Sequence, residues 1–207
     1  VDHFIDTIVY GDDPFHTSES IFDAYDAFNE AAALSRPGAG GVMYLPWLRG
    51  SIAPKADPRM RGGFINIGLD TDRNDMARAV LEGIALNFRW LRDPVEKFVK
   101  RSFSHVVFYG GGAKSDLWSQ IMADVLGVPV HPLDQPHHAN TVGTALLGFE
   151  RLGMIGVDDV LTIPQAASEF EPEAANVARY DELSARFAQA YKTTRPLFRK
   201  LNRPNRT

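Results

Sequence analysis

The chain has 207 residues, with 22 Lys and Arg, 26 Asp and Glu and no cysteine. Its net charge of −4 lacks the basic excess of nucleic-acid-binding proteins, and the absence of cysteine excludes disulfides and thiolate metal ligands. No apolar stretch reaches the roughly 18 residues of a spanning helix, and no signal peptide opens the sequence. We therefore expect a cytoplasmic protein without nucleic-acid or membrane partners, and the start at Val1 suggests a piece of a longer chain.

The first part of the chain predicts one helix and two short strands. Apolar residues spaced by three and four predict a helix from about residue 17 to Leu34. Residues 42–45 predict a short buried strand. In residues 64–69, apolar and polar side chains alternate, which predicts a second strand with one face in the core.

The strongest helix signal covers residues 75–92. Its apolar side chains form a stripe with a period near 3.6, and Asp72 or Asn74 can cap its first turn. Gly83 leaves room for close packing on a sheet or another helix. Pro94 is expected to stop or kink the helix.

A strand, a glycine turn and a helix follow one another in the middle of the chain. The apolar run 105–109 predicts a buried strand, and three consecutive glycines, 110–112, allow a sharp turn. Ser115 can cap a helix over 116–126, which Gly127 would end. Such a turn at a helix N-terminus leaves N–H groups that suit an anion or a nucleotide.

The remaining elements complete an α/β pattern. We expect a short strand at 128–131, a helix beginning at Thr141 and a last helix over 176–194, interrupted at Pro196. The basic residues 195–207 are expected to form a frayed tail. Alternating helices and strands predict an α/β fold with a partly parallel sheet, whose missing strands would lie upstream of the chain.

Two nucleotide-binding patterns can be compared with the glycine turn directly. The phosphate loop GxxxxGK[ST] is absent, because Ala113 rather than glycine precedes Lys114. The dinucleotide fingerprint GxGxxG is met only at Gly110 and Gly112, but Asp134 stands where a ribose-binding acid is expected. A Rossmann domain that binds a nicotinamide or a methyl donor therefore remains an alternative.

A third interpretation rests on a family resemblance. Residues 110–130, GGGAKSDLWSQIMADVLGVPV, resemble the adenosine-binding segment of the FGGY carbohydrate kinases, most of all of the xylulose kinase branch. Residues 45–64, 75–85 and 143–147 resemble further stretches of that family in the same order. Each stretch is weak alone, but the four together are specific. Residues 51–53 are Ser-Ile-Ala where the family usually has Glu-Arg-Thr, which indicates a divergent branch.

This resemblance implies an actin-like, ribonuclease-H-like α/β fold, incomplete at its N-terminal side. Residues 1–207 would form the C-terminal, nucleotide-binding portion of a two-domain sugar kinase. In that family ATP, together with Mg²⁺, phosphorylates a hydroxyl group of an open-chain sugar or polyol. The implied substrate is a pentulose such as xylulose, or a related polyol, and ATP and ADP are the implied nucleotides.

The resemblance also implies roles for individual residues. Gly111, Gly112 and Ala113 would line the adenosine and phosphate side, Asp116 would lie near the adenine, and Ser115 is a further candidate for nucleotide binding. No segment resembles the catalytic base, the sugar contacts or the phosphate hairpin, which are expected upstream of the chain, so the fragment alone is expected to be inactive. No metal ligands are expected here.

The implied partners are the sugar or polyol, the N-terminal kinase domain of the same protein and a second copy in a homodimer. A non-catalytic actin-like module, with the glycine turn empty and closed, remains a further alternative.

Other polar residues have simpler interpretations. Glu82, within the predicted helix 75–92, is expected to make a structural hydrogen bond rather than to act in acid–base chemistry. Asp57 and Arg61 are expected to pair and to hold their loop. Neighbouring His137 and His138 have no third ligand close in sequence, so no metal site is expected there.

Overall fold

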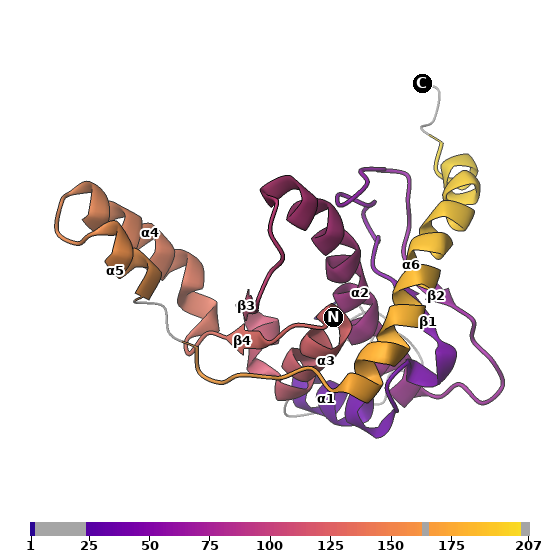
Figure 1. Cartoon of the computed structure of the whole chain (residues 1–207). Coiled ribbons are helices and arrows are strands. Elements are labelled where there is room, and N and C mark those ends of the chain that lie inside the picture. Colours follow the sequence, from indigo (N-terminus) through magenta and orange to yellow (C-terminus); the bar gives the residue numbers. More distant parts are fainter. Residues whose placement is uncertain (3–23, 163–165, 204–207) are drawn as a thin grey trace. The chain divides into compact units, whose positions relative to one another are not determined.

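The computed structural model describes residues 1–2, 24–162 and 166–203 (Figure 1). The predicted start of the first helix, near residue 17, lies outside the described residues. The chain divides into two compact units, one formed by Val1–Val99 with Ala178–Thr207 and the other by Lys100–Val177.

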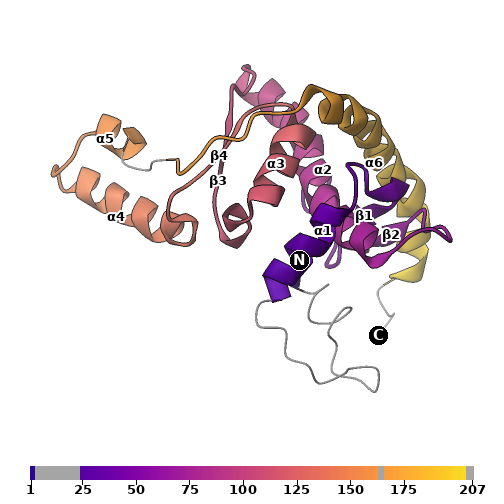
Figure 2. The same ribbon diagram turned by 90° about the horizontal axis from the view of Figure 1, so that it is seen from below.

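The first unit is a small antiparallel strand pair packed with helices. Met43 lies opposite Ile65 and Leu45 opposite Gly63 in this pair. Figures 1 and 2 show α2 (Arg73–Val99) and α6 (Ala174–Leu201) running beside the two strands. The elements are α1 (Ala24–Leu34), η2 (Ala39–Gly41), β1 (Met43–Leu45), β2 (Gly63–Ile65), α2 (Arg73–Val99) and α6 (Ala174–Leu201), the last from Ala178 onward.

Helix α2 begins at a side-chain cap and packs tightly on β1. The Asp72 carboxylate accepts a hydrogen bond from the Asp75 amide at 2.9 Å, which confirms Asp72 as the cap. A Cβ atom on Gly83 would lie 2.2 Å from the carbonyl oxygen of Tyr44. Only glycine allows this approach, so the predicted close packing at Gly83 is confirmed.

The predicted strand over 64–69 is wrong beyond its first residues. Strand β2 ends at Ile65, because Asn66 adopts a left-handed conformation with a φ of 63°. The Asn66 side chain donates a hydrogen bond to the Gly41 carbonyl oxygen at 2.9 Å. Beyond this turn Ile67 and Leu69 are exposed, not buried on one face of a strand.

Two helices continue through prolines that were expected to stop or interrupt them. Helix α2 runs through Pro94 to Val99, and α6 runs through Pro196 to Leu201. Both prolines are exposed, so water can satisfy the carbonyl group that loses its helical partner. Residues 195–201 of the tail that was expected to fray are therefore helical.

The Glu82 carboxylate joins three segments of the first unit. It is 3% exposed, and its Oε1 accepts hydrogen bonds from the Gly38 amide at 2.9 Å, Arg78 Nε at 2.7 Å and the Tyr180 hydroxyl at 2.7 Å. Burial raises the pKa of Glu82, while the neighbouring Arg78 guanidinium acts in the opposite direction. The predicted structural role of Glu82 is confirmed.

The Asp57 carboxylate attaches the end of α6 to the loop between β1 and β2. It is 1% exposed, and its Oδ2 accepts hydrogen bonds from Arg195 Nε at 2.9 Å and Arg199 Nε at 2.7 Å. Burial alone would raise the pKa of Asp57, but these two hydrogen bonds lower it to about 2. The expected pair with Arg61 is wrong, because Arg61 Nη1 donates to the carbonyl oxygens of residues 58 and 60 instead.

The second unit contains the parallel strands that the α/β pattern predicts, but the expected burial of the first of them is wrong, because Val107 is 47% exposed. Val106 of β3 (Val106–Phe108) lies opposite Val130 of β4 (Val130–Pro132). Isolated antiparallel bridges join Val130 to Phe170 and Leu133 to Ala166 on the other side of β4. The other edge of β3 has no strand partner among the described residues. The elements are β3 (Val106–Phe108), η3 (Gly111–Lys114), α3 (Asp116–Leu126), β4 (Val130–Pro132), η4 (Pro136–His138), α4 (Ala139–Arg151) and α5 (Val157–Thr162).

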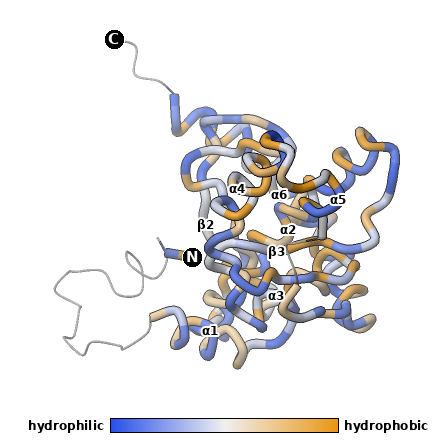
Figure 3. Tube along the Cα trace, turned by 90° about the vertical axis from the view of Figure 1, so that its left-hand side faces the viewer, coloured by the Kyte–Doolittle hydropathy of each residue, from blue (hydrophilic) through white to orange (hydrophobic). Residues whose placement is uncertain are grey.

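Polar and apolar residues alternate along the helices (Figure 3). In the part of the chain that the structure describes, no helix combines the length and the apolar character needed to cross a membrane.

Replacing Gly83 with alanine should destabilise the first unit. The new methyl group would collide with the backbone of β1, an overpacking effect of about 2 kcal/mol or more. Gly143, on α4, has no atom within 4 Å of its would-be Cβ, so Gly143→Ala is the control and should stabilise its helix slightly. Urea unfolding midpoints measure both effects, and equal midpoints for the two variants would contradict the close contact.

Replacing Asp57 with asparagine should destabilise the protein in a pH-dependent way. Because the native state lowers the pKa of Asp57 from 3.8 to about 2, its ionised form adds stability at all pH values above about 4. That contribution is lost as the pH falls through 2. The difference in unfolding midpoint between the natural protein and Asp57→Asn should therefore shrink between about pH 4 and pH 2. A difference that stays constant over this range would show that the charge of Asp57 contributes nothing.

Candidate functional site

The glycine turn lies between β3 and the short helix η3. Gly110 has a φ of 90° and a ψ of −177°, a conformation that suits glycine alone. Its amide donates a hydrogen bond to the carbonyl oxygen of Pro136 at 2.9 Å, which ties the turn to the start of η4. The turn that follows β3 is therefore hydrogen-bonded to the segment that follows β4.

Helix α3 has the caps and bounds that the sequence predicts. The Ser115 hydroxyl oxygen accepts a hydrogen bond from the Trp118 amide at 3.1 Å, and the helix spans Asp116–Leu126. Gly127, with a φ of 66°, ends it in the left-handed conformation. The N-terminus of α3 therefore directly follows the glycine turn.

Two amide groups at this junction have no hydrogen-bond acceptor in the described part of the chain. The Ala113 and Ser115 amides bond back to the carbonyl oxygens of residues 110 and 112, each at 3.1 Å. Among the described residues, the amides of Gly111 and Gly112 donate to no acceptor. Unpaired N–H groups beside a helix N-terminus attract anions and hydrogen-bond acceptors.

Gly111 and Gly112 have different surroundings. A Cβ on Gly112 would lie 2.3 Å from Trp118 Cζ3 and 3.2 Å from Phe108 Cζ, because the two aromatic rings pack edge to face beneath the turn. A Cβ on Gly111 would have His137 Cε1 as its nearest neighbour, at 3.8 Å. Gly112 is therefore required by internal packing, whereas Gly111 is exposed and leaves open space above the turn.

All five residues expected at the nucleotide site lie in this one short segment. Gly111 and Asp116 are exposed, so a ligand can reach both. Ala113 is 7% exposed, so only its backbone could face a ligand, and the Ser115 hydroxyl already caps α3. Whether these residues bind a nucleotide stays a prediction.

The packing role of Trp118 and the position of His137 were not predicted from the sequence. Trp118 supports the turn from below, and His137 of η4 lies beside Gly111. The spacing of three residues between Ser115 and Trp118 marks the cap, but it does not show that the Trp118 ring turns back under Gly112. The position of His137 depends on the parallel pairing of the strands, which no local signal reveals.

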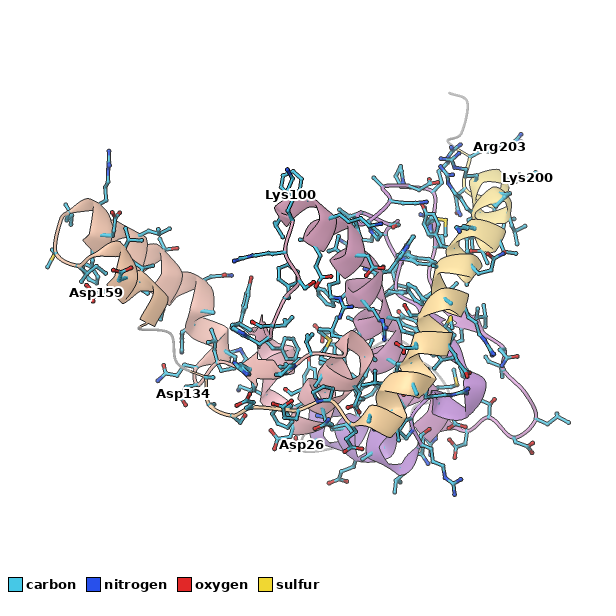
Figure 4. All side chains as sticks on the ribbon, in the orientation of Figure 1. Asp26, Lys100, Asp134, Asp159, Lys200 and Arg203 are labelled. Atoms are coloured by element: carbon cyan, nitrogen blue, oxygen red, sulfur yellow. The ribbon has the colours of Figure 1, made fainter. Side chains whose placement is uncertain are left out.

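The topology after β4 does not favour the Rossmann alternative. Asp134 lies in the loop beyond β4 (Figure 4). A third parallel strand should follow it, but the next segment that pairs with β4 is antiparallel, through the bridges of Ala166 and Phe170.

Potential metal ligands do not gather in the described residues. No group of three His, Cys, Asp or Glu side chains there could hold a metal ion. His137 and His138 lie in η4 and are exposed.

Alanine at Gly112 should destabilise the second unit, whereas alanine at Gly111 should not. The first substitution forces a methyl group against the Trp118 ring and should cost about 2 kcal/mol. The second places its methyl group in open space and should change stability by less than about 0.5 kcal/mol. Urea unfolding followed by tryptophan fluorescence compares the two variants. If Gly112→Ala unfolds at the same urea concentration as Gly111→Ala, the ring contact does not constrain the turn.

Comparison with known proteins places the chain in a family. The model of the FGGY family of carbohydrate kinases, C-terminal domain, matches residues 3–150. The chain is 31% identical over 180 residues to a xylulose kinase of Staphylococcus epidermidis, which covers 84% of this chain and 35% of that protein. It thus spans about a third of the length of such relatives.

Solved structures agree with this match. A xylulose kinase from Rhodospirillum rubrum superposes with a TM-score of 0.72 at 32% identity, over 84% of this chain and 35% of that one. A Plasmodium falciparum glycerol kinase, solved with ADP, has the same fold, with a TM-score of 0.70 at 18% identity over 84% of this chain and 34% of that one. The fold is therefore the actin-like fold of the sugar kinases, and the chain belongs to the FGGY family of carbohydrate kinases as part of its C-terminal domain.

Proposed function

We propose that this chain supplies the adenine-nucleotide part of the active site of an ATP-dependent carbohydrate kinase. The observation that carries the proposal is the open glycine turn at Gly111, followed directly by the capped N-terminus of α3. The substrate of the complete enzyme is a pentulose such as xylulose, or a related polyol. The two xylulose kinases described above, to which the chain is similar, support this substrate class.

The geometry suits a purine nucleotide laid across the turn. Absence of a side chain at Gly111 lets the nucleotide approach the backbone closely. The unpaired amides of Gly111 and Gly112 offer hydrogen bonds to acceptor atoms of the nucleotide. Gly112 contributes indirectly, because its packing on Trp118 fixes the path of the turn.

Asp116 defines the orientation of the nucleotide in this proposal. Its exposed carboxylate, in the first turn of α3, would repel a phosphate group but can accept a hydrogen bond from the amino group of adenine. The adenine would therefore lie toward Asp116 and the phosphates toward the glycines. The ADP bound to the glycerol kinase of the same fold is consistent with ATP as the donor.

The rest of the catalytic apparatus belongs to the other parts of the complete enzyme. Phosphoryl transfer needs a base that accepts the proton of the substrate hydroxyl and cations that neutralise the transferred group. In the residues described here no cluster of carboxylates and histidines could bind Mg²⁺. In our proposal the ion accompanies the ATP phosphates, and the N-terminal kinase domain supplies the base and the sugar contacts. Residues 1–207 then act as the C-terminal, nucleotide-binding portion of a two-domain enzyme.

The test is calorimetric titration of the full-length kinase with Mg²⁺ and ATP. Gly111→Val fills the open space without a clash and should raise the Kd for ATP about tenfold or more, a loss of about 1.4 kcal/mol. Gly148→Val is the matched control, because Gly148 is also exposed and a Cβ there would meet no atom within 4 Å, whereas the nearest atom to a Cβ on Gly111 is His137 Cε1 at 3.8 Å. Gly112→Val is not informative, since it disrupts packing on Trp118.

The selectivity for the base tests the role of Asp116. Asp116→Ala should reduce the preference for ATP over GTP, because guanine carries a carbonyl oxygen where adenine carries its amino group. If Gly111→Val and Asp116→Ala both keep the Kd of the natural enzyme, the nucleotide binds elsewhere and the proposal is wrong.

A further inference from the structure

A second group of charged side chains, separate from the glycine turn, lies where the loop between β1 and β2 meets the end of α6. Arg59, from the loop, and Arg195 and Arg199, from α6, surround the buried carboxylate of Asp57. We propose that this arginine cluster, defined by Arg59, Arg195 and Arg199, is a binding site for a small molecule that carries a phosphate dianion.

The three guanidinium groups converge on one carboxylate. Asp57 Oδ2 receives hydrogen bonds from Arg195 Nε at 2.9 Å and Arg199 Nε at 2.7 Å, and Arg59 Nε lies 3.9 Å from Oδ1. Asp57 is 1% exposed, whereas the arginine side chains are 38–41% exposed. The carboxylate thus forms the floor of the cluster, and the cations reach the solvent.

Positive charge at this place exceeds negative charge. Three guanidinium groups against one carboxylate leave two positive charges uncompensated. Asp57 is the only acidic residue in sequence segments 46–69 and 183–203. Figure 4 shows Lys200 and Arg203 at the same end of α6. The Asn202 amide group, bonded to the Arg59 carbonyl oxygen at 3.1 Å, holds this end of the helix against the loop.

The donors of the arginine cluster are mostly unused. Each guanidinium group has five N–H donors, and within the described residues only the Nε groups of Arg195 and Arg199 donate hydrogen bonds. A dianion placed over the cluster would receive several of the remaining donors and neutralise the two excess charges. Guanidinium groups match the geometry of phosphate oxygens, which makes a phosphate dianion the preferred ligand.

The compact shape of the cluster favours a small ligand. Nucleic acids and anionic membranes bind along extended tracks or faces of positive charge, whereas these three side chains meet at one point. The chain as a whole has a net charge of −4, which would repel a long polyanion. A phosphorylated sugar and inorganic phosphate present the same dianion, and the inference does not rest on the proposed kinase activity.

The experiment measures binding of inorganic phosphate and of xylulose 5-phosphate to the full-length protein by calorimetry, at constant ionic strength. Arg59→Gln removes one guanidinium group but keeps the Arg59 amide that donates to Asp57 Oδ1 at 3.2 Å, so the fold should persist. We expect about a tenfold weaker Kd in Arg59→Gln. Arg186→Gln, at an exposed position of α6 outside the arginine cluster, is the control and should bind as the natural protein does.

A second variant separates charge from geometry. Arg199→Lys keeps the positive charge but loses the planar fork, so it should also weaken phosphate binding. Tighter binding of the sugar phosphate than of inorganic phosphate would identify the ligand as a phosphorylated sugar, and equal binding would identify phosphate itself. Both results support the site.

Four results would overturn the proposal. Phosphate binding could be unchanged in both Arg59→Gln and Arg199→Lys, or chloride at the same ionic strength could produce the same signal. Loss of phosphate binding in Gly111→Val, with no change in Arg59→Gln, would place the ion at the glycine turn instead. Tighter binding of an oligonucleotide or of anionic vesicles than of phosphate would assign the cluster to a macromolecular partner.

Discussion

Buried carboxylates join sequence-distant parts of the first unit, and the Glu82 carboxylate is the central one. It receives donors from the turn before β1, from its own helix and from Tyr180 of α6. A buried carboxylate that loses a partner costs several kcal/mol, so these positions constrain one another. Asp57, in the loop between β1 and β2, is a second buried carboxylate, and its partners Arg195 and Arg199 lie farther along α6. The two carboxylates therefore attach α6 to the rest of the unit at two places along its length.

The sequence predicts what is decided locally and misses what is decided by distant neighbours. The bounds of α3 could be predicted because Ser115 and Gly127 act within one turn of the helix. The partners of Asp57 could not, because they lie 138 and 142 residues away along the chain. The continuation of α6 through Pro196 depends on solvent exposure and on the anchoring of the following turn, neither of which is visible in a local pattern.

The candidate nucleotide site shows how consecutive identical residues can have opposite roles. Gly111 and Gly112 cannot be distinguished in the sequence, and a family resemblance assigns both to the ligand. The structure separates them by the Trp118 ring, which occupies the space that a side chain on Gly112 would need. A glycine-rich turn of this kind therefore combines one position selected by internal packing with another that remains available to a bound molecule.

The one-sided pairing of β3 has a consequence for how the chain behaves in solution. The backbone N–H and C=O groups along the outer edge of β3 pair with no strand among the described residues. A sheet this narrow is seldom stable alone, and an uncovered edge templates the addition of another extended segment. Preparations of the 207-residue chain should accordingly self-associate as concentration rises, through main-chain geometry, unless a neighbouring strand caps that edge.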